Sequence, residues 1–291
     1  MTNSLFRRML RIAVAGIVGF TALHAMADSA ASLQGKYTEL REPLAKNSYG
    51  RAMYIDSSEA GDNLKGDVYA VLDHPFTKVS GALKDPADWC SILILPFNTK
   101  YCHAGQGSGG PALNVRIGRK FDQPVEAAYK IEFAMHNVAA QGDFFETRLN
   151  AGTGPFGTRD YRIVVSAVPI EGANKTFLHL SYSYGYGAMG RMAMRAYLAT
   201  VGADKVGFSQ QPGANGQPQY IGGVRGAIER NAMRYYLAID SYLDSLSVPP
   251  EQRVEKRIQN WFNATERYPR QLREMDRPTY VAMKRTEVER Q

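Results

Sequence analysis

The chain has 291 residues, of which 44% are hydrophobic and 22% are charged, and its formal net charge is +7. This length suits one large domain or two small ones. The basic residues form no cluster along the sequence, so nucleic acid is not a predicted partner.

The first 27 residues predict an export signal rather than part of the fold. Its basic start, apolar stretch and small-residue cleavage site are Arg7, Arg8 and Arg11, residues 12–23, and Ala25, Met26 and Ala27. An apolar stretch of this length is short for a transmembrane helix. Cleavage is expected between Ala27 and Asp28, which would leave a periplasmic or secreted protein. An uncleaved membrane anchor is the alternative.

Loss of the three signal arginines would lower the net charge from +7 to about +4. A mild positive charge favours contact with anionic lipid headgroups, so peripheral membrane contact is one predicted interaction.

The mature chain opens with a polar segment, 28–50, which predicts a loosely attached arm with one short helical turn. Residues 51–59 alternate between apolar and polar side chains and predict a strand. The turn residues 61–63 lead into a second predicted strand, 64–72.

Two helix starts then follow within residues 73–89. Pro75 and Pro86 suit the first helical position, where a backbone N–H, which proline lacks, would have no acceptor within the helix. Asp73 or His74 is the predicted cap of the first helix, and Asp85 that of the second. Phe76, Val79 and Leu83 give the first helix one apolar face, and Trp89 is expected to be buried against the sheet.

This order, with Asp73, Pro75, Val79, Leu83, Asp85, Pro86 and Trp89 at these offsets, resembles the opening of the START-like superfamily. That group is also called SRPBCC and includes polyketide cyclases and the birch-pollen allergen. The resemblance implies an α+β helix-grip fold, in which a curved antiparallel sheet surrounds a long C-terminal helix, with two short helices after the early strands. It places this domain at residues 51–247. The superfamily usually has one strand before the helix pair, so the second predicted strand is a departure.

Both cysteines of the chain, Cys90 and Cys102, lie in the predicted mature protein. In an oxidising compartment such a pair predicts a disulfide, here between the second short helix and the next strand. By chain entropy, closing a loop of this size stabilises the fold by roughly 3 kcal/mol. No C-x-x-C motif is present, so redox catalysis is not predicted.

The middle of the chain predicts an antiparallel sheet. Five runs rich in aromatic and β-branched residues are separated by turn residues: 112–121, 128–136, 143–151, 160–168 and 175–184. Apolar and polar side chains alternate within them, as in a sheet that is covered on one face. The absence of a β-α-β rhythm excludes a doubly wound parallel fold.

A helix at 188–201, a hairpin around 212–216 and a long helix at 222–246 are predicted next. The apolar stripe of the long helix comprises Ile228, Ala232, Tyr235, Ile239 and Tyr242. Residues 248–291 form a charged helical extension with an expected disordered end after Pro278.

Several apparent motifs carry no predicted chemistry. Residues 185–190 satisfy G-x-G-x-x-G, but they close an antiparallel sheet, so a tight turn is the favoured interpretation over a nucleotide site. The four histidines of the mature chain are not at metal-ligand spacing, and surface or hydrogen-bonded roles are expected for them: His74, His103, His136 and His179. No metal, cofactor or catalytic residue is predicted.

The 17 tyrosines are more than a dry core needs, and they are compatible equally with a ligand cavity and with tyrosines at half-exposed sheet positions. The leading hypothesis is an exported protein that binds a lipid, a sterol-like molecule or another hydrophobic ligand between sheet and long helix. Its expected lining is Phe133, Met135, Tyr161, Ile163, Val165, Ile228, Ala232, Tyr235 and Ile239. An enzyme of cyclase or hydrolase type and an interaction protein with a filled cavity are the alternatives. The sequence predicts no oligomeric state.

Overall fold

The computed structural model describes residues 29–213 and 216–291. The predicted cleavage site between Ala27 and Asp28 lies outside the described residues. Within them, no helix combines the length and the apolar character that crossing a membrane requires.

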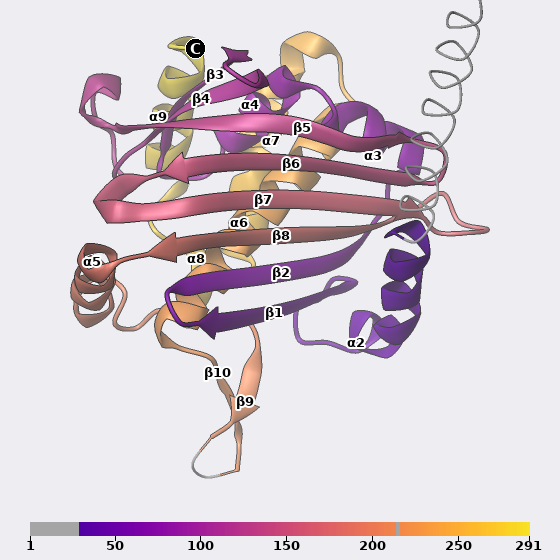
Figure 1. The fold of residues 1–291 in the computed structure, drawn as a ribbon, viewed down its shortest axis with the longest axis horizontal. Coiled ribbons are helices and arrows are strands. Elements are labelled where there is room, and N and C mark those ends of the chain that lie inside the picture. The colour runs from indigo at the N-terminus through magenta and orange to yellow at the C-terminus, as the bar shows by residue number, and fades with distance from the viewer. Residues whose placement is uncertain (1–28, 214–215) are drawn as a thin grey trace, which may run out of the picture.

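One antiparallel sheet of eight strands dominates the molecule, in the spatial order β1-β2-β8-β7-β6-β5-β4-β3 (Figure 1). Its strands are β1 Met53–Ala60, β2 Asn63–Leu72, β3 Thr99–Gly107, β4 Gly110–Ile117, β5 Tyr129–Gln141, β6 Phe144–Thr153, β7 Thr158–Pro169 and β8 Thr176–Tyr186. A hairpin of β9 Gln210–Pro212 and β10 Pro218–Tyr220 stands apart from the sheet.

The helices lie mainly on one face of the sheet, here called the inner face. They are α3 Phe76–Leu83, α4 Pro86–Leu93, α5 Ala188–Ala199, α6 Gly223–Ser245, α7 Pro250–Glu266, α8 Pro269–Leu272 and α9 Arg277–Glu289. In Figure 1 the opposite, outer face is turned towards the viewer and the helices α6 and α7 lie behind the strands. The short 3-10 turns are η1 Val125–Ala127 and η2 Pro155–Gly157. The long helix α6 packs against the inner face, so the predicted α+β helix-grip fold is confirmed, including the extra early strand.

The helix pair α3–α4 follows its local sequence with one difference. The Asp85 carboxylate accepts a 2.8 Å hydrogen bond from the Ala87 backbone N–H and caps α4, as predicted. The predicted Asp73 or His74 cap of α3 is wrong, because Pro75 is the N-cap and no side chain caps this helix. A proline N-cap has an extended backbone that leads into the helix without a side-chain acceptor.

The predicted disulfide is present. Cys90 of α4 is bonded to Cys102 of β3, with the two Cα atoms 5.1 Å apart. The bond links the helix pair to the strand at one edge of the sheet. It therefore constrains the connection that carries the chain from β2 to the opposite edge.

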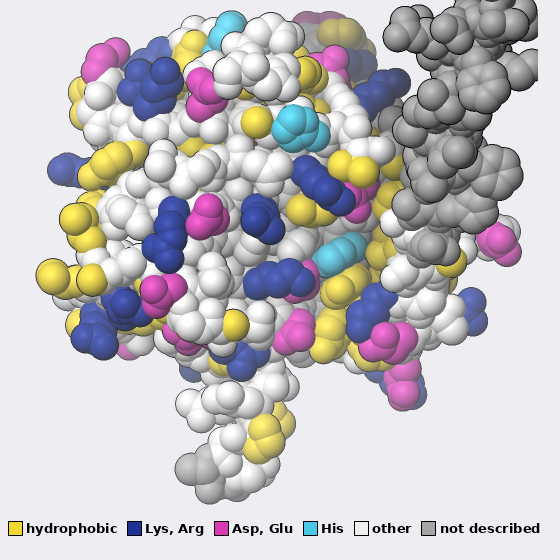
Figure 2. Space-filling model, viewed as in Figure 1, with side chains coloured by type: hydrophobic (Ala, Val, Ile, Leu, Met, Phe, Trp, Pro, Cys, Tyr) yellow, Lys and Arg dark blue, Asp and Glu magenta, His cyan; other side chains and the backbone are white. Residues whose placement is uncertain are grey.

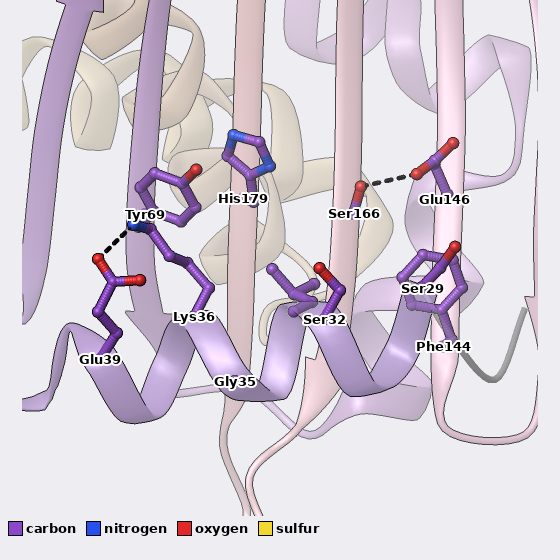
Figure 3. A pocket seen from close by; sticks show the side chains of 11 residues that line it. Ser29, Ser32, Gly35, Lys36, Glu39, Tyr69, Phe144, Glu146, Ser166 and His179 are labelled. Atoms are coloured by element: carbon purple, nitrogen blue, oxygen red, sulfur yellow. Dashed lines mark hydrogen bonds and ion pairs between the residues drawn. The ribbon is translucent and has the colours of Figure 1, made fainter.

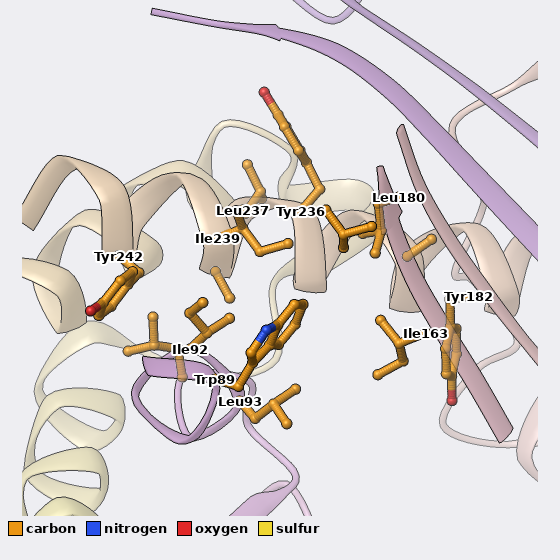
Figure 4. Close-up of a cluster of buried hydrophobic side chains, with 14 of the residues drawn as sticks. Trp89, Ile92, Leu93, Ile163, Leu180, Tyr182, Tyr236, Leu237, Ile239 and Tyr242 are labelled. Atoms are coloured by element: carbon orange, nitrogen blue, oxygen red, sulfur yellow. The ribbon is translucent and has the colours of Figure 1, made fainter. Parts of the chain in front are cut away.

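The main core fills the space between the inner face and α6, and Figure 4 shows its part around Trp89. At Gly66 of β2 the helix comes close to the strand. A Cβ atom built at Gly66 would lie 3.3 Å from both the Ala232 Cβ and the Ile228 Cγ1. A side chain here would force α6 outward by a few tenths of an ångström, so the middle of α6 is in direct contact with the sheet.

A second, smaller core lies on the outer face of the sheet. Residues 29–39 are helical and continue into α2 Arg41–Ala45. The buried residues of this N-terminal unit pack on Phe144, Val168 and Phe177 and comprise Ala30, Leu33, Leu40 and Leu44. The expectation of a loosely attached arm is wrong, since these four apolar residues are spaced to bury one face of the unit.

The C-terminal extension packs on the main core. Trp261 of α7 contacts both Phe97 and Tyr280, with ring centroids 4.9 and 5.2 Å away. Tyr280 belongs to α9 and is fully buried. The expected disordered end after Pro278 is wrong, because α9 continues to Glu289 and buries side chains that the charge content of this segment obscured.

Candidate functional site

A cavity of about 210 Å³ lies between the inner face of the sheet and α6. It occupies one end of the space that the two enclose, beside the connection from β4 to β5. Its walls come from β3, β4, β5, β7 and β8, from the η2 turn, and from α4 and α6. They comprise Leu93, Asn98, Thr99, Val115, Ile117, Ile131, Phe133, Pro155, Phe156, Thr158, Tyr161, Ile163, Tyr182, Tyr184, Asn231 and Tyr235.

The cavity brings together four of the nine residues that the sequence analysis placed in it: Phe133, Tyr161, Ile163 and Tyr235. The other five lie in the close-packed core: Met135, Val165, Ile228, Ala232 and Ile239. These five do not line the cavity, because the close approach of α6 at Gly66 closes the space along the middle of the helix. Helical periodicity identified a buried stripe but did not show where along α6 the helix stands away from the sheet.

Ala232 gives a direct test of this division. Ala232→Trp is expected to lower the free energy of unfolding by about 1–3 kcal/mol or more, because the bulk enters a filled contact with β2. Urea unfolding measures the change, with Ala196→Trp on the exposed face of α5 as the control that should be neutral. An unchanged unfolding midpoint for Ala232→Trp would place open space at the middle of α6.

Tyrosine rings form much of the cavity wall. Tyr161 stacks on Tyr184 with ring centroids 5.3 Å apart, and its hydroxyl donates a 2.7 Å hydrogen bond to Thr158 Oγ1. Tyr182 and Tyr235 meet edge to face at 5.1 Å, and their hydroxyls are hydrogen-bonded. Burial raises the pKa of Tyr182 well above its usual value, so its hydroxyl stays protonated. The wall therefore combines apolar ring faces with a few neutral polar groups.

Tyr182 and Tyr184 were not among the predicted cavity residues. Both occupy alternate positions on β8, in the run 175–184 that the sequence analysis recognised as a strand. That alternation places the two rings on one face and His179, Ser181 and Ser183 on the other, and it is the signal in the sequence that could have identified them.

The cavity adjoins an apolar groove of about 480 Å³ on the surface. Three residues line both spaces: Ile117, Pro155 and Phe156. Phe156 is 53% exposed, and its ring centroid is 5.4 Å from that of Tyr129. Its φ of +56° is in the left-handed region, which costs a non-glycine residue on the order of 1–3 kcal/mol. Phe156 thus stands at the mouth of the cavity in a conformation that the surrounding turn must maintain.

Large exposed apolar side chains occur on the segments that form or adjoin this mouth. They comprise Phe121, Tyr129, Phe156, Met189 and Met192. The start of α5 lies against the η2 turn, where a Cβ built at Gly157 would be 4.0 Å from that of Met189. Figure 2 shows hydrophobic side chains along the left edge, where Figure 1 places α5. A clustering of large exposed apolar residues is typical of a site that contacts a ligand, a protein or a membrane.

No protein-family model matches the sequence, and no curated protein matches it. Solved structures do match, at low identity. A conserved protein from Geobacillus kaustophilus is 13% identical, with 62% of this chain and 95% of that chain covered and a TM-score of 0.36. Ara h 8.0201 is 9% identical, with 66% and 99% covered and a TM-score of 0.36. Truncated norcoclaurine synthase from Thalictrum flavum is 14% identical, with 48% and 87% covered and a TM-score of 0.32.

These neighbours include helix-grip proteins of the START-like superfamily. The fold of this chain follows from its own strands and helices, as described above. The ligands and reactions of these neighbours are properties of those proteins.

A second hollow, of about 670 Å³, lies on the outer face between the sheet and residues 29–39 (Figure 3). His179 donates a 2.7 Å hydrogen bond from Nε2 to Asp67, and its ring stacks on Tyr69 at 4.2 Å. Ser166 donates to Glu146 over 3.0 Å, and Lys36 pairs with Glu39. The predicted hydrogen-bonded role of His179 is confirmed. The polar groups of this hollow pair with one another, so it is the weaker candidate for a ligand site.

Among the described residues, no group of three or more His, Cys, Asp or Glu side chains is placed to hold a metal ion.

Proposed function

We propose that this protein binds a hydrophobic or amphipathic ligand, of lipid or sterol-like character, in the cavity between the sheet and α6. The observation that carries the proposal is an apolar cavity with tyrosine hydroxyls that opens past Phe156 onto an apolar groove. Sites for small molecules are typically apolar with a few placed polar groups, and they measure about 300–1,000 Å³. The cavity alone is smaller than this, so one acyl chain or ring system would enter it while the remainder lies in the groove.

The proposed compartment is the periplasm or the exterior of the cell. The basic and apolar pattern of residues 1–27 supports export, and the Cys90–Cys102 bond suits an oxidising environment. A carrier in the cell envelope would meet its ligand at a membrane surface.

Peripheral membrane contact is therefore part of the proposal, with the mouth of the cavity facing the lipid. Helix α5 presents Met189 and Met192, which are 64% and 71% exposed, together with two arginines, and it contains no acidic residue. Exposed apolar side chains interspersed with arginines are typical of a helix that lies in the headgroup region of an anionic bilayer.

Filling the mouth tests the cavity. The neutral dye Nile red is expected to bind the parent protein and to bind Ile117→Trp at least about tenfold more weakly, because Ile117 lines both the cavity and the groove. Fluorescence titration measures both affinities. Val138→Trp is the matched control, since Val138 is an exposed aliphatic residue of the same sheet that lines neither space.

The thermal midpoint of Ile117→Trp should stay close to that of the parent, because Ile117 is only half-buried. Absence of Nile red binding by the parent protein would contradict the proposed function and favour an interaction protein with a filled cavity. Equal binding by the parent and Ile117→Trp would place the dye elsewhere.

A further inference from the structure

Positive charge is concentrated behind the part of the cavity wall that α6 forms. Four cationic side chains gather between α5, α6, the loop after β4 and the segment after α8: Lys120, Lys205, Arg230 and Arg234. Arg234 and Lys120 contact the Glu274 carboxylate at 2.5 and 2.7 Å. Among the described residues, Glu274 is the one carboxylate in contact with these cations, so the cluster carries an excess of three positive charges.

Burial makes this excess costly. Arg230 is 1% exposed and Arg234 is 7% exposed. Arg230 donates to the Val206 carbonyl and, over 3.1 Å, to the Tyr197 hydroxyl, which are both neutral acceptors. A buried cation without an anionic partner is unfavourable by several kcal/mol. The cluster is thus electrostatically incomplete without another anion.

One donor of the cluster is also left without an acceptor. The Nε of Arg234 is buried and has no hydrogen-bond partner in the part of the chain that the structure describes. Burial lowers the pKa of Arg234, and the Glu274 carboxylate offsets this only in part. Burial alone would raise the pKa of Tyr197, but Arg230 and Lys120 lower it overall. The lowered pKa of Tyr197 reports a positive local potential.

Helix α6 connects this cluster to the cavity. Arg234 Nη1 donates a 3.3 Å hydrogen bond to the side-chain oxygen of Asn231, and Asn231 lines the cavity together with Tyr235. One turn of α6 therefore directs residues 231 and 235 towards the cavity. Residues 230 and 234 of the same turn belong to the cation cluster. The Arg234 guanidinium is one hydrogen bond away from the cavity wall.

We propose that the ligand is an anionic amphipath whose carboxylate or phosphate group binds at Arg234, with its apolar part in the cavity. This inference rests on the proposed function and specifies the chemical class of its ligand. Guanidinium groups bind carboxylates and phosphates with paired, charge-assisted hydrogen bonds. Arg230, Lys120 and Lys205 would supply the remaining positive potential around the anion.

Displacement of Nile red by alkyl compounds of equal chain length tests the charge requirement. Dodecanoate and dodecyl phosphate are expected to displace the dye from the parent protein at concentrations at least tenfold below those of dodecanol. In the double variant Arg234→Met, Glu274→Met this preference should fall to about threefold or less, with dodecanol and Nile red affinities unchanged. The double change removes the Arg234–Glu274 pair together, so neither of these two charges is left buried alone, and the one contact it takes from another cation is that of the partly exposed Lys120.

Two further variants keep the test decisive. Lys205→Met, at a half-buried lysine outside the cavity wall, is expected to reduce the preference for dodecanoate without loss of folding. Arg225→Met on α6 is the matched control, because Arg225 bonds to Ser57 of β1 and is outside the cluster. Its preference for dodecanoate should equal that of the parent.

The outcomes separate the two proposals. Nile red binding with equal displacement by dodecanol and dodecanoate would overturn the anionic ligand while retaining the hydrophobic cavity. Stabilisation by inorganic phosphate, with no added effect of the alkyl chain in dodecyl phosphate, would identify a free anion site and also overturn it. Failure of Nile red to bind would contradict the cavity itself.

Discussion

Replacement of Trp89 by alanine is expected to lower the free energy of unfolding by roughly 3–5 kcal/mol, as for a large side chain removed from a well-packed core. Trp89 is 1% exposed and is surrounded by side chains of α4 and α6 (Figure 4). Its indole Nε1 donates a 2.7 Å hydrogen bond to the Leu83 carbonyl at the end of α3. The indole therefore joins the two short helices to each other and to the core.

Urea unfolding followed by circular dichroism measures this loss, and Trp261 supplies an independent fluorescence signal in the variant. Trp89→Phe is the matched control, because it retains an aromatic ring and removes the N–H donor. Its smaller cost, about 1–3 kcal/mol, would report the carbonyl left without a partner. A loss below about 1 kcal/mol for Trp89→Ala would contradict the anchoring role of the helix pair.

Glu287→Ala is expected to cost about 3–5 kcal/mol, because it leaves buried positive charges without their anion. Glu287 of α9 bonds to Lys100 over 2.9 Å and to Lys284 over 2.6 Å, and all three side chains are at most 1% exposed. Lys284 also donates to the carbonyls of Pro96 and Thr99. This buried group of charges attaches the C-terminal helix to the start of β3.

Glu289→Ala is the control for this prediction, since Glu289 is exposed on the same helix. The pH supplies a second comparison. Burial lowers the pKa of Lys284 to about 8 from an ordinary value of 10.5. Between pH values of about 8 and 10.5, Lys284 is more protonated in the unfolded chain than in the folded protein. The contribution of Lys284 to stability therefore rises with pH in this range.

Without Glu287, Lys284 loses its proton more readily still. The cost of Glu287→Ala, measured by urea unfolding, should therefore be smaller at pH 9.5 than at pH 7. A cost below about 1 kcal/mol at pH 7 would contradict the attachment of α9 through these charges.

The sequence by itself determined the features that local chemistry sets. Pro86 and Asp85 specify the start of α4 because capping depends on neighbouring residues alone. The alternation of apolar and polar residues identified the inner strands, since side chains of a strand point to opposite faces in turn. The Cys90–Cys102 pair was identified because a short loop joins the two residues and the chain has no other cysteine.

The tertiary structure decided which residues meet across long stretches of chain. Gly66 and Ala232 are in contact because one missing side chain lets α6 touch β2, and that contact limits the cavity to one end of the helix. The N-terminal helix and α9 are ordered by apolar residues whose partners lie far away in the sequence. Lys120, Arg234 and Glu274 form one cluster although more than a hundred residues separate the first from the others. Burial and electrostatic complementarity depend on the spatial neighbours of a residue, and only the folded chain defines these.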